Sequence, residues 1–261
     1  MPIVNTQNDP FVLERLRNAL SSQGDILKFR ALYTSEFVEI PDLNTSEFWN
    51  KKVRDDICGF SKDIFTKRKI NLIADFLKTK DGKLLDIGFG SADLERILAI
   101  SNKRLDLYGI DISDLAIKTV REFIRSGDFR IGSIFRIPHE GSFFDFVSTL
   151  DVLEHIPPSK ALVAYGEVYR VLKRKGIFII SVPLNETLEK MIKEGVNPNA
   201  HVRVYTPDIL KMELKIMGFK ILKEIYLYAF KNFYSIKNFL IKFFPKDFRK
   251  PNLLIVIAKK V

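Results

Sequence analysis

Two aspartates and two glycines in the first half of the chain carry the clearest chemical signal. Asp86 ends a short apolar run, and Gly88 and Gly90 follow at alternate positions before helical spacing of apolar residues resumes. A strand, a glycine turn and a helix in this order present backbone N–H groups to a ligand. The next apolar run ends in Asp111, where a carboxylate is placed to accept both hydroxyls of a ribose. The pattern predicts a nucleoside site at the carboxyl end of a parallel sheet.

The details of the turn separate two classes of nucleoside cofactor. A dinucleotide fold has the pattern G-x-G-x-x-G, with a pyrophosphate over the helix N-terminus. Here the sixth position is Asp93, a carboxylate that would repel a pyrophosphate. Asp86, directly before the turn, suits a cofactor with a cationic head. On the turn alone, some other doubly wound protein remains the alternative.

Three further segments extend this pattern into a family resemblance. Asp86-x-Gly88-x-Gly90 with Asp111 resembles the class I S-adenosylmethionine-dependent methyltransferases. Residues 144–157 resemble the fourth strand and following loop of the small-molecule branch, including the ubiquinone-type O-methyltransferases. The run VYRVLKRKG before the fifth strand and the segment 201–219 also match, in the right order. The resemblance covers roughly residues 66–228.

The resemblance implies S-adenosylmethionine as the cofactor and assigns its contacts by position. Ser133 stands where many relatives carry an acid for the adenine amino group, and Ala92 replaces their third glycine. On a helix expected over residues 61–78, Arg68 or Lys69 could meet the methionine carboxylate, with a solvated helix face as the alternative. The residues expected to bind the cofactor are Asp86, Gly88, Gly90, Asp111, Ile112, Ser133, Ile134, Leu150, Asp151 and Arg68.

Histidines are the candidate catalytic groups. Methyl transfer from a sulfonium is an in-line displacement, so the protein mainly positions two reactants, and no metal site is predicted. A hydroxyl acceptor would benefit from a general base with a pKa near neutral. His155 and His201 follow the fourth and fifth strands on the cofactor side, whereas His139 lies in a turn expected to be exposed. For His155 and His201, shaping the loop is the alternative role.

Absent motifs narrow the acceptor. No Asp/Asn-Pro-Pro-Tyr/Phe run follows the fourth strand, so the arrangement for exocyclic amines of bases is missing. The single cysteine, Cys58, precedes the fold, which excludes a Pro-Cys nucleophile and a disulfide framework. A small-molecule or lipid-like substrate is therefore expected, and nucleic acid is disfavoured. An RNA or protein methyltransferase is the alternative within the class, and a non-catalytic cofactor-binding or scaffold protein is the alternative from another class.

Alternating apolar runs and amphipathic segments from residue 82 predict the fold. It is a doubly wound, seven-stranded, mainly parallel α/β sheet with an antiparallel last strand, the Rossmann-like methyltransferase fold. Residues 1–60 are expected to form a helical lid or substrate-side addition, and residues 61–261 the cofactor-binding domain. Strands are expected at residues 83–88, 105–111, 129–132, 143–150, 176–182, 219–227 and 253–258.

A basic, Phe-rich insertion at residues 229–250 is the most individual part of the chain. Residues 220–261 carry ten Lys/Arg and two acids, so most of the net charge of +10 is local. The insertion shows helical spacing beside the substrate mouth. Four roles stay open: a plainly packed helix, contact with an anionic membrane, a dimer contact, or nucleic-acid binding. With no signal peptide or spanning segment in the sequence, the expected location is cytoplasmic, with or without peripheral membrane contact.

Overall fold

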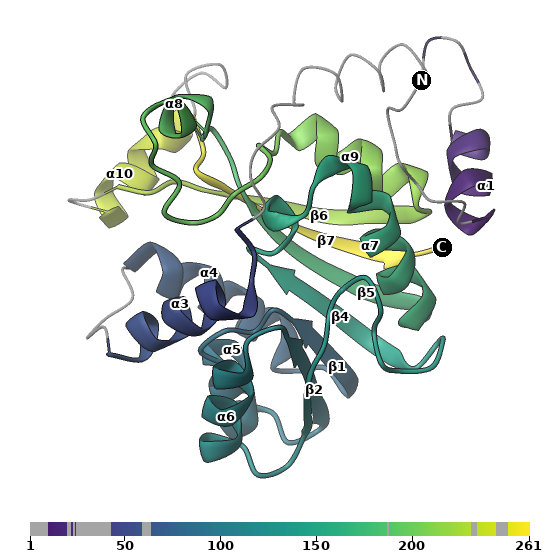
Figure 1. Cartoon of the computed structure of the whole chain (residues 1–261), viewed down its shortest axis with the longest axis vertical. Helices are drawn as coiled ribbons and strands as arrows, with labels where there is room; N and C mark the ends of the chain where they lie inside the picture. The colour runs from purple at the N-terminus through teal and green to yellow at the C-terminus, as the bar shows by residue number, and fades with distance from the viewer. Residues whose placement is uncertain are drawn as a thin grey trace.

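The computed structural model describes residues 10–19, 22, 24, 43–58, 64–186, 188–230, 234–243 and 250–261. The described chain is built on a seven-stranded sheet with the order β3-β2-β1-β4-β5-β7-β6 (Figure 1). Every strand except β7 runs in the same direction. The strands are β1 (Gly82–Ile87), β2 (Leu105–Asp111), β3 (Asp128–Ile131), β4 (Phe144–Leu150), β5 (Leu172–Pro183), β6 (Phe219–Leu227) and β7 (Leu253–Lys260).

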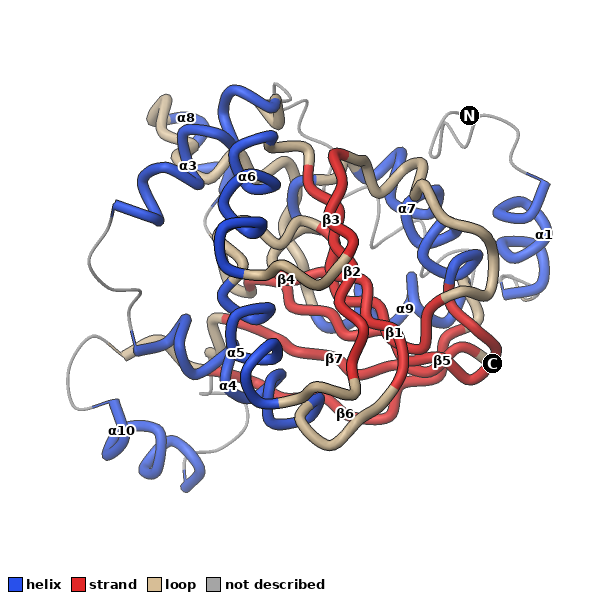
Figure 2. The backbone as a smooth tube through the Cα atoms, turned by 90° about the horizontal axis from the view of Figure 1, so that it is seen from below, coloured by secondary structure: helices blue, strands red, loops and turns tan. Residues whose placement is uncertain are grey.

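Helices cover both faces of the sheet (Figure 2). One buried apolar cluster joins α4, α5 and α6 to one face, and a second joins α1, α7 and α9 to the other. The helices are α1 (Pro10–Ala19), α3 (Ser46–Cys58), α4 (Ile64–Leu77), α5 (Asp93–Ser101), α6 (Asp114–Phe123), α7 (Pro158–Val171), α8 (Leu188–Lys193), α9 (Pro207–Ile216) and α10 (Tyr234–Leu240), with 3₁₀ turns η1 (Leu153–His155) and η2 (Ile241–Phe243).

The expected fold class is confirmed. The sheet is doubly wound, because strand order reverses between β1 and β4, and in such sheets ligands bind at that point outside the carboxyl ends of the strands. Strands β2 and β6 begin and end at the expected residues. Strand β5 is longer than expected, since it begins at Leu172 and takes in the charged run before Gly176.

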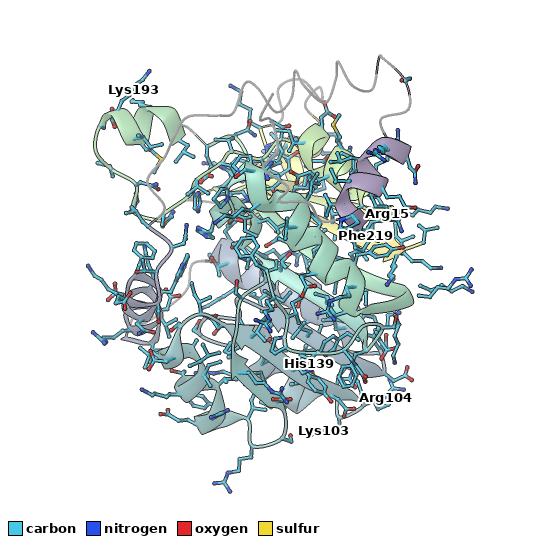
Figure 3. All side chains as sticks on the ribbon, turned by 45° about the vertical axis from the view of Figure 1, so that its right-hand side comes forward. Arg15, Lys103, Arg104, His139, Lys193 and Phe219 are labelled. Atoms are coloured by element: carbon cyan, nitrogen blue, oxygen red, sulfur yellow. The ribbon has the colours of Figure 1, made fainter. Side chains whose placement is uncertain are left out.

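The described parts of the N-terminal segment lie in two places. Val12 of α1 is fully buried in the cluster with α7 and α9, and Arg15 donates a hydrogen bond from Nη2 to the Tyr169 hydroxyl at 2.8 Å. Figure 3 shows Arg15 beside Phe219 at the start of β6. Helix α3 instead lies with α4 and α6 (Figure 1). The remaining residues of the predicted 1–60 unit lie outside the described ranges, and its boundary stays a prediction.

Helix α10 stands at the edge of the molecule. It follows β6 and precedes β7, and both figures place it away from the two covering layers (Figures 1 and 2). The apolar side chains of Ile236, Phe239, Leu240 and Phe243 are exposed. No helix in the described ranges is long and apolar enough to cross a bilayer.

Candidate active site

Two adjoining cavities open at the carboxyl ends of β1, β2 and β4. Their volumes are about 240 Å³ and 700 Å³. Together they form one cleft, because five residues line both cavities. The shared residues are Trp49, Gly88, Gly90, Asp151 and His155.

The glycine turn is shaped so that backbone faces the cleft. Gly88 and Gly90 have φ values of +71° and +56°, which L side chains rarely adopt. A Cβ on Gly88 would lie 2.7 Å from Val152 Cγ2, whereas a Cβ on Gly90 would enter open space. Glycine is therefore needed at Gly88 for conformation and room, and at Gly90 for conformation and for close approach of a ligand.

Asp111 joins the turn to the second strand. Its Oδ2 accepts the Gly90 N–H at 2.9 Å, and its Oδ1 accepts the Ser113 N–H at 2.8 Å. Burial raises the pKa of Asp111, and these two bonds act in the opposite direction. The side chain lines the smaller cavity with its remaining lone pairs available. The position expected for a ribose acid thus holds an oriented carboxylate.

Asp86 is buried beneath the turn next to a second acid, Glu95 of α5. Burial raises the pKa of Asp86 to about 6, while the nearby Glu95 side chain and the hydrogen bond that the Ser148 hydroxyl donates at 2.7 Å lower it. Burial and then the charge of Asp86 raise the pKa of Glu95 well above its ordinary value. Burial thus raises the pKa of both carboxyl groups, and that of Glu95 is raised further by the charge of Asp86. Glu95 was not anticipated from the sequence, because nothing in its spacing indicates that α5 turns it toward Asp86.

The predicted adenine residues come together in the smaller cavity. Ile112, Ser133 and Ile134 line it, with Gly132 and Phe135 beside them. The Ser133 hydroxyl accepts the Phe135 N–H at 3.3 Å. Leu150 lines the larger cavity and not the smaller one.

Lys69, rather than Arg68, turns toward the cleft. Arg68 lies on the exposed face of α4 and lines neither cavity, so its predicted cofactor role is corrected. Successive helical residues point about 100° apart, and Lys69 is the one that turns inward, with 6% of its surface exposed. It forms an ion pair with Asp151, which also accepts from the Ser181 hydroxyl at 2.6 Å. Desolvation opposes ionisation of Asp151, but Lys69 and Ser181 hold its pKa below the ordinary value.

Both predicted histidines face the larger cavity. His155 Nδ1 lies 3.3 Å from the Ala200 carbonyl oxygen, and His201 Nδ1 lies 2.8 Å from Glu186 Oε2. Their ring centroids are 4.9 Å apart. Burial, then the neighbouring His201, lowers the pKa of His155 to about 4, so its ring is neutral at physiological pH.

Glu154 completes this corner of the cleft. Its side chain is 1% exposed, and burial followed by the charge of Asp151 raises its pKa well above the ordinary value. The sequence singled out its histidine neighbour but not Glu154 itself. His139, by contrast, is neither in the cleft nor exposed as expected: it is partly buried and stacks on Phe143.

Helix α3 and the residues before it supply a wall of the cleft. The sequence predicted a lid or substrate-side addition over residues 1–60, but not which of its residues would face the cleft. Trp49 packs edge-on against His155, with centroids 4.7 Å apart. Asn44 donates from Nδ2 to the carbonyl oxygens of His155 and Ala200, both at 3.2 Å. Asn50 accepts the Ser113 hydroxyl at 2.6 Å, next to the predicted ribose acid. The only signal in this segment was a polar residue before an aromatic one. It predicts where a helix begins but not where that helix packs in the fold.

Comparison with known proteins is consistent with this geometry. Residues 85–180 match a family model described as a methyltransferase domain. A demethylmenaquinone methyltransferase of Thermotoga maritima is 27% identical over 125 residues, which span 48% of this chain and 52% of that protein. The match therefore spans about half the length of this relative.

Solved structures share the fold over most of the chain. The cyclase SpnF superposes with a TM-score of 0.62 and 18% identity, covering 85% of this chain and 98% of that one. The N-methyltransferase NodS of Bradyrhizobium japonicum WM9, in complex with S-adenosyl-L-homocysteine, superposes with a TM-score of 0.59 and 11% identity, covering 81% and 98%. Residues 85–180 therefore match a methyltransferase domain, and the described chain shares the sheet order and the fold of these solved structures.

Proposed function

We propose that the chain transfers a methyl group from S-adenosylmethionine to a small-molecule or lipid-like acceptor. The observation that carries this is the continuous cleft at the carboxyl ends of β1, β2 and β4, whose walls bring together the glycine turn, the aspartates Asp86, Asp111 and Asp151, and two histidines. The methyltransferase relative named for a quinone substrate supports an acceptor of this size and kind.

The cleft fits a cationic nucleoside. Asp86, Asp111 and Asp151 bring carboxylates to its walls, and the Gly90 position leaves room for close approach. When bound, S-adenosylmethionine supplies an electrophilic methyl group on a sulfonium. The residues proposed to hold it are Asp86, Gly88, Gly90, Asp111, Ile112, Ser133, Ile134, Leu150 and Asp151, with Lys69 in the place first expected for Arg68.

His155 and His201 are proposed to act on the acceptor. Each ring has Nδ1 engaged by an oxygen of the protein, which leaves Nε2 for other partners. Both rings line the larger cavity, and Trp49 walls the cleft beside His155 and reduces the access of water. Orientation of an acceptor hydroxyl, rather than covalent chemistry, is the work expected of these groups.

A tritium-transfer experiment tests the acceptor class. S-adenosylmethionine labelled in its methyl group is incubated with the purified chain and a cell extract, which is then separated into lipid, aqueous small-molecule, RNA and protein fractions. Label is expected in the lipid or the aqueous small-molecule fraction, and the Asp111→Ala variant should transfer little. Label confined to RNA or protein would overturn the acceptor class. Cofactor binding without transfer to any fraction would support the scaffold alternative.

Contact with an anionic membrane is proposed for the surface formed by Ile236, Phe239, Leu240 and Phe243, here named the α10 stripe. These residues follow i, i+3, i+4, i+7 spacing and are 49–73% exposed. The sequence of residues 229–250 adds six Lys/Arg against one acid, which favours anionic lipid. The insertion starts beside the cleft, because Asn252, which lines the larger cavity, donates its N–H to Leu227 at 2.8 Å.

Vesicle flotation measures this contact. The chain is expected to float with phosphatidylcholine vesicles that contain phosphatidylserine and to float less without it. The double variant Phe239→Ser/Phe243→Ser should lose most flotation, because it removes the largest apolar side chains of the α10 stripe. Ile100→Ser is the matched control, since Ile100 is 83% exposed on α5, outside the stripe. Equal flotation of both variants would refute membrane contact through the α10 stripe. A dimer that forms in the unmodified chain and not in the double variant would favour the dimer alternative.

A further inference from the structure

Three potential metal ligands converge in the acceptor part of the cleft. Glu154, His155 and His201 each offer one ligand atom, and these atoms lie within 4.8 Å of one another. All three residues line the larger cavity. Two segments of the chain supply them: η1 after β4, and the loop between α8 and α9.

Hydrogen bonds hold the two segments together. The Val202 N–H donates to the Glu154 carbonyl oxygen at 3.0 Å. Asn44 bridges the carbonyl oxygens of His155 and Ala200 from the opposite side. Hydrogen bonds to backbone atoms therefore help to hold the three side chains beside one another in the cleft.

Each imidazole already has the outer partner that a metal ligand needs. In metal sites, the ring nitrogen that does not bind the ion donates its N–H to a carbonyl or carboxylate, which sets the tautomer. His155 Nδ1 faces the Ala200 carbonyl oxygen at 3.3 Å, and His201 Nδ1 faces Glu186 Oε2 at 2.8 Å. With Nδ1 as the donor in both rings, both Nε2 atoms carry a lone pair.

One oxygen of the third ligand lacks a hydrogen-bond partner among the residues that the structure describes. Glu154 is 1% exposed, and its Oε2 is buried without a hydrogen-bond partner among the described residues. Leaving a buried carboxylate oxygen unpaired is costly, so such a group calls for a ligand or a proton. A cation at this corner would satisfy it.

We propose that Glu154, His155 and His201 bind one divalent transition-metal cation of the Zn²⁺ type. Two nitrogens and one carboxylate oxygen favour such an ion over Mg²⁺, which prefers oxygen ligands. Zinc sits about 2 Å from each ligand, so binding draws the three atoms slightly closer together. Three protein ligands leave a position open toward the cleft, as in catalytic zinc sites.

The open position gives the proposed function a more definite acceptor. An acceptor hydroxyl bound there would lose its proton more readily, and its oxygen would be oriented toward the cofactor part of the cleft. The acceptor atom is then an oxygen. This consequence rests on the proposed function, whereas binding of the cation does not.

Calorimetry with Zn²⁺ alone tests the site. The full chain is used without an affinity tag and with Cys58→Ser, so that no thiolate competes. One equivalent of Zn²⁺ is expected to bind, and His155→Gln and His201→Gln should each weaken it at least tenfold, with Glu186→Gln weakening it about tenfold through His201. His139→Gln is the matched control, because His139 stacks on Phe143 and lines neither cavity of the cleft.

Thermal unfolding supplies a second readout that does not depend on activity. Zn²⁺ should raise the unfolding temperature of the chain and of His139→Gln, but not that of His201→Gln. Absence of saturable Zn²⁺ binding, or binding unchanged in a His155→Gln/His201→Gln variant that still unfolds cooperatively, would overturn the proposal. Zn²⁺ binding lost in that variant, together with no methyl transfer to any extract fraction, would uphold the cation site and reject the proposed function. If no Zn²⁺ binds and a chelator leaves methyl transfer unchanged, the cation site is rejected and the proposed function is upheld.

Discussion

Asp111→Ala is expected to weaken the binding of S-adenosylmethionine by about 100-fold or more. A hydrogen bond to a charged group contributes about 1.5–3 kcal/mol, so two ribose hydroxyls on one carboxylate amount to at least about 3 kcal/mol. The loss has a second source. Without its Oδ2 the Gly90 N–H loses its acceptor, and the glycine turn keeps the bond from the Gly88 N–H to the Ile110 carbonyl oxygen of β2 but loses the one to Asp111.

Isothermal titration with S-adenosylmethionine and with its demethylated product measures the effect. Asp106→Ala is the matched control, because Asp106 lies on the same strand and is exposed. The control should bind both ligands as the unmodified chain does. An Asp111→Ala variant with unaltered affinity for both would contradict the placement of the cofactor in the cleft.

The second large effect concerns stability rather than binding. Glu213→Ala is expected to lower the free energy of unfolding by about 3–5 kcal/mol, because it leaves a buried guanidinium without its carboxylate. Arg203 and Glu213 have fully buried side chains, and Arg203 Nη2 donates to Glu213 Oε1 at 2.8 Å. Tyr205 donates its hydroxyl to Glu213 Oε2 at 3.2 Å. Since Arg203 follows His201 by two residues, the variant should also loosen the loop that carries this histidine.

Urea denaturation followed by circular dichroism tests the buried pair. Lys211→Ala is the control, because Lys211 pairs with Glu224 in a partly exposed position, where an ion pair contributes about 0–1 kcal/mol. Replacing both buried partners, as Arg203→Met/Glu213→Met, should recover much of the loss, since no charge then stays buried alone. If Glu213→Ala costs no more than Lys211→Ala, the pair does not support the loop.

Strands were predictable because their signal is local. A parallel strand covered on both faces is a short apolar run, and β2 begins and ends where that run does, at Leu105 and Asp111. The edge strand β6, which pairs antiparallel with β7, also begins and ends at the expected residues. Strand β5 exceeds its apolar run, because its first residues pair with Phe144 before a register shift in β4. Charged residues at such a start carry no strand signal, so the extension was not visible.

The site was predictable where its residues follow directly from strand ends. The glycine turn, Asp111 and the two histidines lie in the cleft, as their positions after strands indicated. Lys69 could not be chosen over Arg68, because the sequence does not set the rotation of α4 about its axis. Glu186 and Asn44 could not be identified at all, because Glu186 lies 15 residues from His201 in sequence and Asn44 lies 111 residues from His155, so no local spacing links either pair.

Helix α3 and the residues just before it touch both ends of the cleft. Asn44 holds the two segments that carry the histidines, and Asn50 holds the start of α6 beside the ribose acid. A displacement of this unit that frees one end breaks bonds at the other. The two parts of the cleft are therefore mechanically coupled through this one short segment of the chain.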